Sequence, residues 1–212
     1  MNRSRGTPRP HTRPAALAAG HGARPRAPYA LLVIDFINPL DFPGAQDLAA
    51  PALAAARATA RLRARVREGG GQVIFANDNY GLWHSEFQEH HRRCRALPGV
   101  PGALARLLAP RADDIAILKP RHSAFFATPL DLILQDMRCR RLIITGLAAD
   151  NCILFTAMDA YVRGYRLWVP EDCTAAESEP AKQGALEHMR RVLKAEVRPA
   201  LAPASSHAAP AR

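Results

Sequence analysis

The 212-residue chain is long enough for one α/β domain of generous size, and none of its apolar runs approaches the ~20 residues that a membrane span needs. Its formal net charge is +10, but residues 1–28 contain six arginines and no acidic residue, so this segment alone contributes +6. An arginine-rich arm could contact nucleic acid or a membrane surface. A solvated leader explains the same composition, so we expect neither as a partner.

The composition divides the chain into three parts. Residues 1–28 are rich in Pro, Ala and Gly, and residues 199–212 in Pro, Ala and Ser, so neither can bury a core. We therefore expect a disordered basic arm, one domain over residues 29–198 and a flexible C-terminal tail. The apolar stretch 15–19 is too short for an export signal. The four cysteines are widely spaced, which favours reduced thiols in a cytoplasmic protein.

Within the domain, apolar β-rich runs alternate with helical patterns. In chain order the sequence predicts a strand at 29–35, a helix at 47–68, a strand at 72–77, an irregular or short-helical stretch at 78–101, a helix at 104–108, a strand at 114–119, a helix at 130–137, a strand at 141–145, a helix at 151–163, a strand at 165–169, a helix at 179–193 and a last strand at 195–198. Continuously apolar strands that alternate with helices indicate a parallel sheet covered on both faces. Right-handed crossovers then give a doubly wound three-layer α/β/α sandwich with a mainly parallel six-stranded sheet.

Three polar residues fall at the carboxyl ends of predicted strands. Asp35 follows the first strand, Lys119 ends the third, and Cys152 lies just beyond the fourth. Ligands of such sheets bind beyond the carboxyl ends of the strands. Each residue alone could be a turn or a solvated strand end, but together they predict one site.

Cys152 lies where a buried strand runs through Thr145-Gly146 into a helix. A thiol in the first turn of a helix faces the positive end of the helix dipole and unpaired N–H groups. These features lower a thiol pKa and supply donors for an oxyanion. The alternative is a small buried hydrophobic residue, which free cysteine often is.

Three segments carry a resemblance to a known family: 32–38 (LVIDFIN), 118–131 (LKPRHSAFFATPLD) and 145–152 (TGLAADNC), with 168–173 (WVPEDC) in agreement. They resemble the isochorismatase-like cysteine hydrolases, which include nicotinamidases and N-carbamoylsarcosine amidohydrolase, over about residues 29–197. The resemblance implies an Asp–Lys–Cys triad of Asp35, Lys119 and Cys152. It also implies a cis peptide bond at Leu147–Ala148 and an oxyanion hole made by the backbone N–H groups of Ala148 and Cys152.

The chain departs from the nicotinamidase pattern at the metal site. Nicotinamidases bind a metal through an Asp-x-His pair after the second strand, whereas this chain has Asp78-Asn79-Tyr80. The histidines further along, at positions 84, 90 and 91, do not restore the spacing. We therefore expect no metal site and no cofactor.

The residues and the resemblance together predict a cysteine hydrolase that cleaves an amide or ureido C–N bond of a small molecule through a covalent thioester. In this interpretation Asp35 accepts the thiol proton of Cys152, and Lys119 keeps Asp35 ionised. Two alternatives stay open. The pocket could hydrolyse a vinyl ether with Asp35 as the acid, or the chain could be a non-catalytic binding protein.

Candidates for the substrate-binding wall are polar or aromatic residues near the predicted site: Asn38, Trp83, His122, Phe125 and Phe126. Simple packing would explain the aromatic ones equally well.

The resembled family commonly forms dimers or tetramers, so we expect a homo-oligomer. The stretch 80–97 carries aromatic residues beside arginines, a combination typical of interface anchors: Trp83, Phe87 and Leu97 with Arg92, Arg93 and Arg95. A lid that lies on its own subunit is the alternative.

Overall fold

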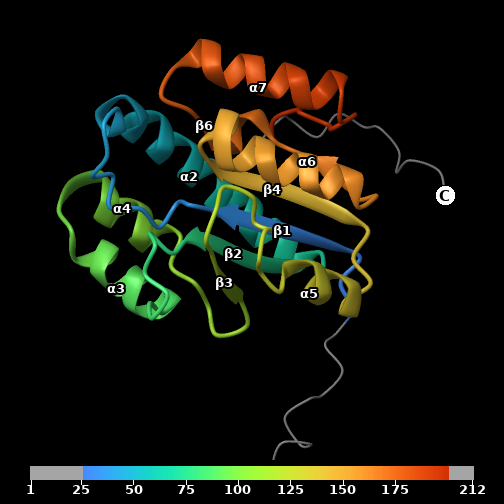
Figure 1. Ribbon diagram of the computed structural model, residues 1–212, viewed down its shortest axis with the longest axis horizontal. Helices are drawn as coiled ribbons and strands as arrows, with labels where there is room; N and C mark the ends of the chain where they lie inside the picture. Colours follow the sequence, from blue (N-terminus) through green and yellow to red (C-terminus); the bar gives the residue numbers. More distant parts are fainter. Residues whose placement is uncertain (1–25, 201–212) are drawn as a thin grey trace, which may run out of the picture.

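The computed structural model describes residues 26–200, and within them a single sheet forms the centre of the molecule (Figure 1). Its strand order is β3-β2-β1-β4-β5, with the short β6 paired to β4, and every pairing is parallel. The strands are β1 (Tyr29–Ile34), β2 (Gln72–Asp78), β3 (Ile115–Lys119), β4 (Arg141–Leu147), β5 (Arg166–Trp168) and β6 (Thr174–Ala175). The predicted doubly wound, mainly parallel six-stranded sheet is confirmed.

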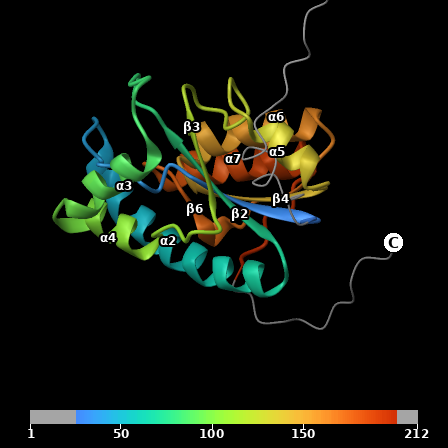
Figure 2. The same cartoon turned by 90° about the horizontal axis from the view of Figure 1, so that it is seen from below.

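Helices cover both faces of the sheet (Figure 2). One layer contains α2 (Ala45–Glu68), α3 (Phe87–Ala96) and α4 (Gly99–Leu107), and the other contains α5 (Leu130–Asp136), α6 (Leu154–Val162) and α7 (Glu179–Arg191). Among residues 26–200, no helix has both the length and the apolar character that crossing a membrane would require.

The two layers follow from the alternation of side chains along the central strand. In β1, Ala30, Leu32 and Ile34 pack into the core beneath α5, α6 and α7, whereas Leu31 and Val33 pack towards α2. All five are fully buried. A strand buried on both faces needs apolar residues at every position, which explains why this run lacks the polar alternation of an edge strand.

The structure differs from the sequence prediction at the sixth strand. Residues 195–198 do not form a strand and make only an isolated bridge between Trp168 and Glu196. The sixth strand is instead the two-residue β6, which pairs with Gly146–Leu147 at the end of β4. Two residues are too few for any hydrophobic period to show in the sequence.

The predicted arm and tail lie almost wholly outside the described residues. Where the description begins and ends, the chain is packed on the domain: Ala27 is buried and donates its N–H to Met137 O at 3.2 Å, and Ala200 is buried and donates to Asp172 Oδ1 at 2.7 Å. The folded part therefore extends slightly beyond the predicted 29–198 at both ends.

Candidate active site

The sheet brings Asp35, Lys119 and Cys152 together. Lys119 Nζ lies 2.8 Å from Asp35 Oδ2 and 3.4 Å from Cys152 Sγ. The ammonium group is thus between the carboxylate and the thiol, although β2 separates β1 from β3 in the sheet. All three side chains are buried, and Lys119 is 0% exposed.

Local backbone geometry fixes the carboxylate. Asp35 follows β1 with a φ of 52°, and its N–H donates to Ala76 O at 3.1 Å. Its Oδ1 accepts the backbone N–H of Asp78 at 2.8 Å, which leaves Oδ2 for Lys119. A side chain held by its own backbone and by two neighbouring strands has little freedom to leave the site.

The nucleophile candidate is positioned by the close approach of β4 to β1. Gly146 has a φ of 138°, and a Cβ there would lie 2.1 Å from Ile34 O, so only glycine fits. The peptide bond between Leu147 and Ala148 is cis. Cys152 then lies in a π-helical turn, Ala149–Ile153, that precedes α6. It does not lie in the first turn of a regular α-helix as the sequence suggested.

The charges of the site set the protonation states. Burial raises the pKa of the Cys152 thiol, the Asp35 carboxylate raises it further, and Lys119 opposes both, so the net shift is upward. This is opposite to the lowering of the thiol pKa that was expected from a helix terminus, and its causes are burial and the adjacent carboxylate. The resting group is therefore a thiol.

The other two groups complement that thiol. Burial raises the pKa of Asp35 above its ordinary value, against the opposing effect of Lys119. Burial also disfavours the charged form of Lys119, but Asp35 and Cys152 outweigh this effect and leave the lysine pKa raised. A buried ammonium next to a carboxylate of increased basicity is suited to proton transfer from the thiol.

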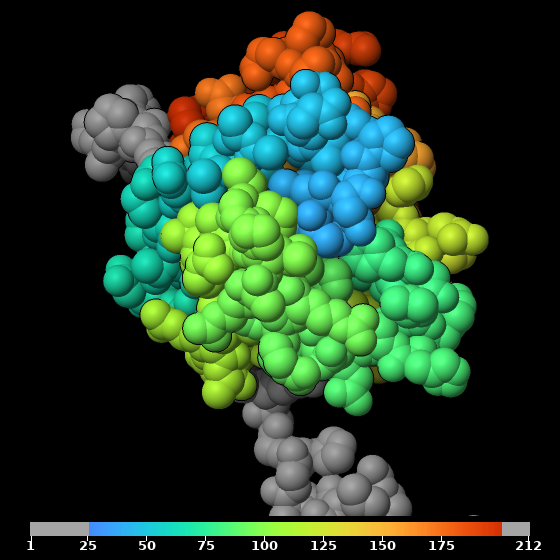
Figure 3. Space-filling view, turned by 90° about the vertical axis from the view of Figure 1, so that its left-hand side faces the viewer, coloured from blue at the N-terminus to red at the C-terminus, as the bar shows by residue number. Residues whose placement is uncertain are grey.

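A cavity of about 310 Å³ opens onto Cys152. Its lining comes from the segments that follow β1, β2, β3, β4 and β6, and Figure 3 shows the first three of these segments meeting at the surface, in blue, green and yellow. The lining residues are Asp35, Asn38, Phe42, Leu48, Asp78, Tyr80, His122, Leu147, Ala148, Asn151, Cys152 and Glu177.

Two of the predicted wall residues lie in this cavity. His122 has its Nδ1 3.9 Å from Cys152 Sγ, and its ring packs against Phe155 with centroids 5.2 Å apart. Asn38 accepts the N–H of Leu40 through its Oδ1 at 2.8 Å, which fixes the side chain at the cavity edge.

The other three predicted wall residues do not line it. Phe125 is buried elsewhere, with the Arg163 guanidinium 4.8 Å from its ring centroid and the ring centroid of Tyr165 6.0 Å away. Phe126 is largely exposed, and Trp83 lies in a separate cavity. In the sequence these aromatics could not be assigned to a face, because the segments that carry them have no regular period.

Sequence reasoning missed several lining residues: Phe42, Leu48, Tyr80, Asn151 and Glu177. Asp78 also lines the cavity, and its Oδ2 lies 3.7 Å from Lys119 Nζ. Asp78 ends β2 just as Asp35 follows β1, so the rule of polar residues at strand ends could have found it. Glu177 follows β6, which the sequence did not reveal as a strand.

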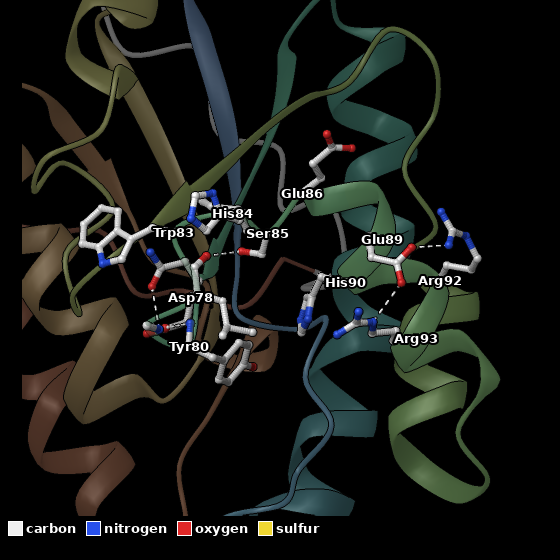
Figure 4. A pocket seen from close by; sticks show the side chains of 14 residues that line it. Asp78, Tyr80, Trp83, His84, Ser85, Glu86, Glu89, His90, Arg92 and Arg93 are labelled. Atoms are coloured by element: carbon white, nitrogen blue, oxygen red, sulfur yellow. Dashed lines mark hydrogen bonds and ion pairs between the residues drawn. The ribbon is translucent and has the colours of Figure 1, made fainter.

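A second cavity of about 600 Å³ adjoins the first and shares Asp78 and Tyr80 with it (Figure 4). Its far side is formed by α3, where Glu89 pairs with both Arg92 and Arg93. Trp83 is 75% exposed in this region, and Tyr80 packs against His90 with ring centroids 5.1 Å apart.

The nicotinamidase-type metal does not fit the residues at this position. Asp78 Oδ1 accepts the N–H of Tyr80 at 2.6 Å, and its Oδ2 faces the Lys119 ammonium, which would repel a cation. His90 Nε2 lies 2.6 Å from Ile37 O. Across residues 26–200, no three His, Cys, Asp or Glu side chains are grouped to hold a metal ion.

The fold and site together define a doubly wound α/β protein with a buried thiol, carboxylate and ammonium at the carboxyl end of its sheet. Residues 29–201 match the isochorismatase domain, and the chain belongs to the isochorismatase family. It is 35% identical over 172 residues to the uncharacterized isochorismatase family protein YaaI of Bacillus subtilis, covering 81% of this chain and 94% of that protein.

Two further similarities concern proteins with a named activity. The chain is 32% identical over 162 residues to maleamate amidohydrolase of Pseudomonas putida, covering 73% of each. The crystal structure of a pyrazinamidase/nicotinamidase from Streptococcus mutans UA159 superposes with a TM-score of 0.62 at 27% identity, covering 80% of this chain and 99% of that one.

Proposed function

We propose that this protein is an amidohydrolase that cleaves the C–N bond of a small amide or ureido compound through a thioester on Cys152. The observation that carries the proposal is the buried Lys119 ammonium group placed 2.8 Å from Asp35 and 3.4 Å from the Cys152 sulfur, next to the cavity that Asp35 and Cys152 line. The similarity to maleamate amidohydrolase and to a nicotinamidase supports the same bond type.

In the first half-reaction Asp35 accepts the thiol proton as the sulfur of Cys152 attacks the substrate carbonyl carbon. The new C–S bond leaves the carbonyl oxygen with a negative charge, which the backbone N–H groups of Ala148 and Cys152 would bind. One such donor is worth about 2.7–4 kcal/mol. Collapse of this intermediate breaks the C–N bond, and Asp35 returns the proton to the departing nitrogen.

In the second half-reaction Asp35 takes a proton from water, and the water oxygen attacks the thioester carbon. Breaking the C–S bond releases the acid product, and the sulfur recovers its proton from Asp35. Throughout both steps Lys119 keeps a positive charge beside the thiolate and the carboxylate, which stabilises each anionic form.

The direct test is a screen of amides, ureido acids and isochorismate with the native enzyme, followed by mass spectrometry of the protein quenched in acid during turnover. We expect amide or ureido hydrolysis and an adduct on the peptide that contains Cys152. Turnover of isochorismate alone, without an adduct, would favour vinyl-ether chemistry, and no turnover at all would favour a binding protein.

The pH profile should report Asp35. Because burial raises its pKa above the ordinary value of 3.8, the carboxylate becomes protonated, and is lost as a base, at a pH higher than that of an exposed aspartate. We expect kcat/KM to fall on acidification with a midpoint above 3.8. A plateau that extends unchanged below this pH would contradict Asp35 as the base.

Activity should not depend on a metal. The Asp78 carboxylate is bonded to Tyr80 N–H and faces Lys119, so it is a poor metal ligand. We expect EDTA-treated protein to retain its turnover, with no stoichiometric zinc, iron or manganese by elemental analysis. Loss of activity on chelation that zinc or manganese restores would contradict this expectation.

Self-association is a further expectation, but the structure changes which residues should test it. Phe87 is buried and packs against Phe75 with ring centroids 5.6 Å apart, so it is a core residue and the prediction that it anchors an interface was wrong. Exposed apolar side chains lie instead at Leu82 and Trp83. They also lie on α6 and near it, at Phe126, Phe155, Met158 and Val162.

We expect light scattering to give a mass at least twice 23.1 kDa at micromolar concentration. A charge in an apolar interface disfavours association, so Val162→Asp should lower the mass if α6 forms the contact, and Trp83→Asp should do so if the stretch after β2 forms it. A monomer of the native protein at high concentration would contradict self-association.

A further inference from the structure

The cavity that contains Cys152 carries an excess of negative charge. Its lining includes three carboxylates, Asp35, Asp78 and Glu177, and no arginine or lysine from residues 26–200. The nearby ammonium of Lys119 is fully buried and is 2.8 Å from Asp35 and 3.7 Å from Asp78. One positive charge therefore faces two of the carboxylates, and the third has no lysine beside it in the described part of the chain.

Glu177 is this third carboxylate, an exposed side chain that borders the cavity. It lies two residues after β6, which pairs with Gly146–Leu147 beside the nucleophile turn. Across the cavity edge, a Cβ on Gly44 would lie 2.7 Å from Glu177 Oε2, so the carboxylate rests against the backbone at the start of α2. The absence of a side chain at Gly44 leaves the space that the carboxylate occupies.

Among the described residues, the charge of Glu177 has no basic side chain as a partner. Within residues 26–200 no Lys, Arg or His nitrogen lies within 4.0 Å of its carboxylate. Cys152, Asn151 and Ala148 line the same cavity, so a substrate whose carbonyl is at the sulfur extends into a space that Glu177 borders. A second negative charge there would be repelled, and a positive one attracted.

We infer that Glu177 is a specificity-determining residue. It makes the enzyme select amides whose group beyond the carbonyl carbon is neutral or positively charged, and reject amides in which this group carries a carboxylate. This inference rests on the proposed amidohydrolase function. It sets the chain apart from the relative named for maleamate, whose substrate carries a carboxylate. Two charges separated by several ångströms in a partly solvated cavity change affinity by about tenfold.

Three amides of the same length test the preference: 3-aminopropanamide is a cation, butanamide is neutral, and succinamate is an anion. We expect kcat/KM for the cation to exceed that for the anion by at least about tenfold in the native enzyme. Glu177→Gln should narrow this ratio, and Glu177→Arg should reverse it. Because exposed charges are screened by salt, the native ratio should also shrink at high ionic strength.

A second measurement does not depend on hydrolysis. The 2-aminoethyl and 2-sulfonatoethyl methanethiosulfonates are reagents of similar size and opposite charge, and each transfers its thioalkyl group to a cysteine with release of methanesulfinate. Labelling of Cys152, followed by peptide mass spectrometry, should be faster with the cation in the native protein. The ratio of the two rates should fall in Glu177→Gln and invert in Glu177→Arg.

Glu179→Gln is the matched control, since this residue is two positions away in the first turn of α7 and does not line the cavity. It should leave both ratios unchanged. If no amide is hydrolysed but the labelling ratios respond to Glu177, the hydrolase proposal fails while the charge selection stands. Labelling and turnover ratios that stay unchanged in Glu177→Gln would overturn the inference.

Discussion

Cys152→Ala is expected to lower kcat for the best amide substrate by at least about a thousandfold, because in the proposed mechanism it removes the atom that forms the thioester. The fold should survive, since alanine is smaller than cysteine and Cys152 borders a cavity. Asp35→Asn should have an effect of similar size, and the double variant should lose little more, because the two groups act in the same proton transfer.

The control for this prediction is Cys139→Ala. Cys139 is also buried, but its Sγ donates to Arg141 O at 3.2 Å at the other end of β4, away from the cavity. Its loss should leave kcat unchanged, and iodoacetamide should label Cys152 faster than Cys139 in the native protein. An active Cys152→Ala enzyme would rule out the covalent route.

Lys119→Met is expected to destabilise the protein by about 3–5 kcal/mol, because it leaves the Asp35 carboxylate buried without its partner. The side chains of this pair are 0% and 7% exposed, so water replaces little of the lost interaction. The double variant Asp35→Asn/Lys119→Met should recover part of that free energy, since it removes both charges. Urea unfolding followed by circular dichroism gives the free energy of unfolding of the native protein and of both variants.

Arg190→Met provides the comparison for an exposed ion pair. Arg190 and Glu187 lie 2.8 Å apart but are 58% and 52% exposed, so the loss should cost less than about 1 kcal/mol. If Lys119→Met and Arg190→Met destabilised the protein equally, burial would not determine how much the Lys119–Asp35 pair contributes to stability. A double variant as unstable as Lys119→Met would show that an unpaired Asp35 is not the cause.

The fold could be predicted because most of its strands have a clear hydrophobic pattern in the sequence. Runs such as 29–34 and 141–147 are apolar on both faces, and the helix at 45–68 has a long pattern of buried alanines, so period and length agree. The short β6 and the π-helical turn at 149–153 have no such signal. They depend on contacts between segments far apart in the chain, which no local window contains.

The three central residues of the candidate site could also be predicted from the sequence. Asp35, Lys119 and Cys152 come together as the rule for strand ends requires. The direction of the Cys152 pKa shift could not be predicted, because it depends on how deeply the thiol is buried and on the neighbouring carboxylate. Trp83, Phe125 and Phe126 were placed in the wall on residue type alone, and type does not say which way an aromatic side chain points.

The pairing of β1 with β4 has a consequence for how the protein is made. Thr145 bonds to Leu32 O from a position 113 residues further along the chain, and this contact joins the strand before the carboxylate to the strand before the thiol. A ribosome releases the segment that carries Asp35 long before the one that carries Cys152. The nascent chain therefore has no assembled reactive centre until Cys152 has been synthesised, so a product terminated before this residue lacks the paired thiol and carboxylate.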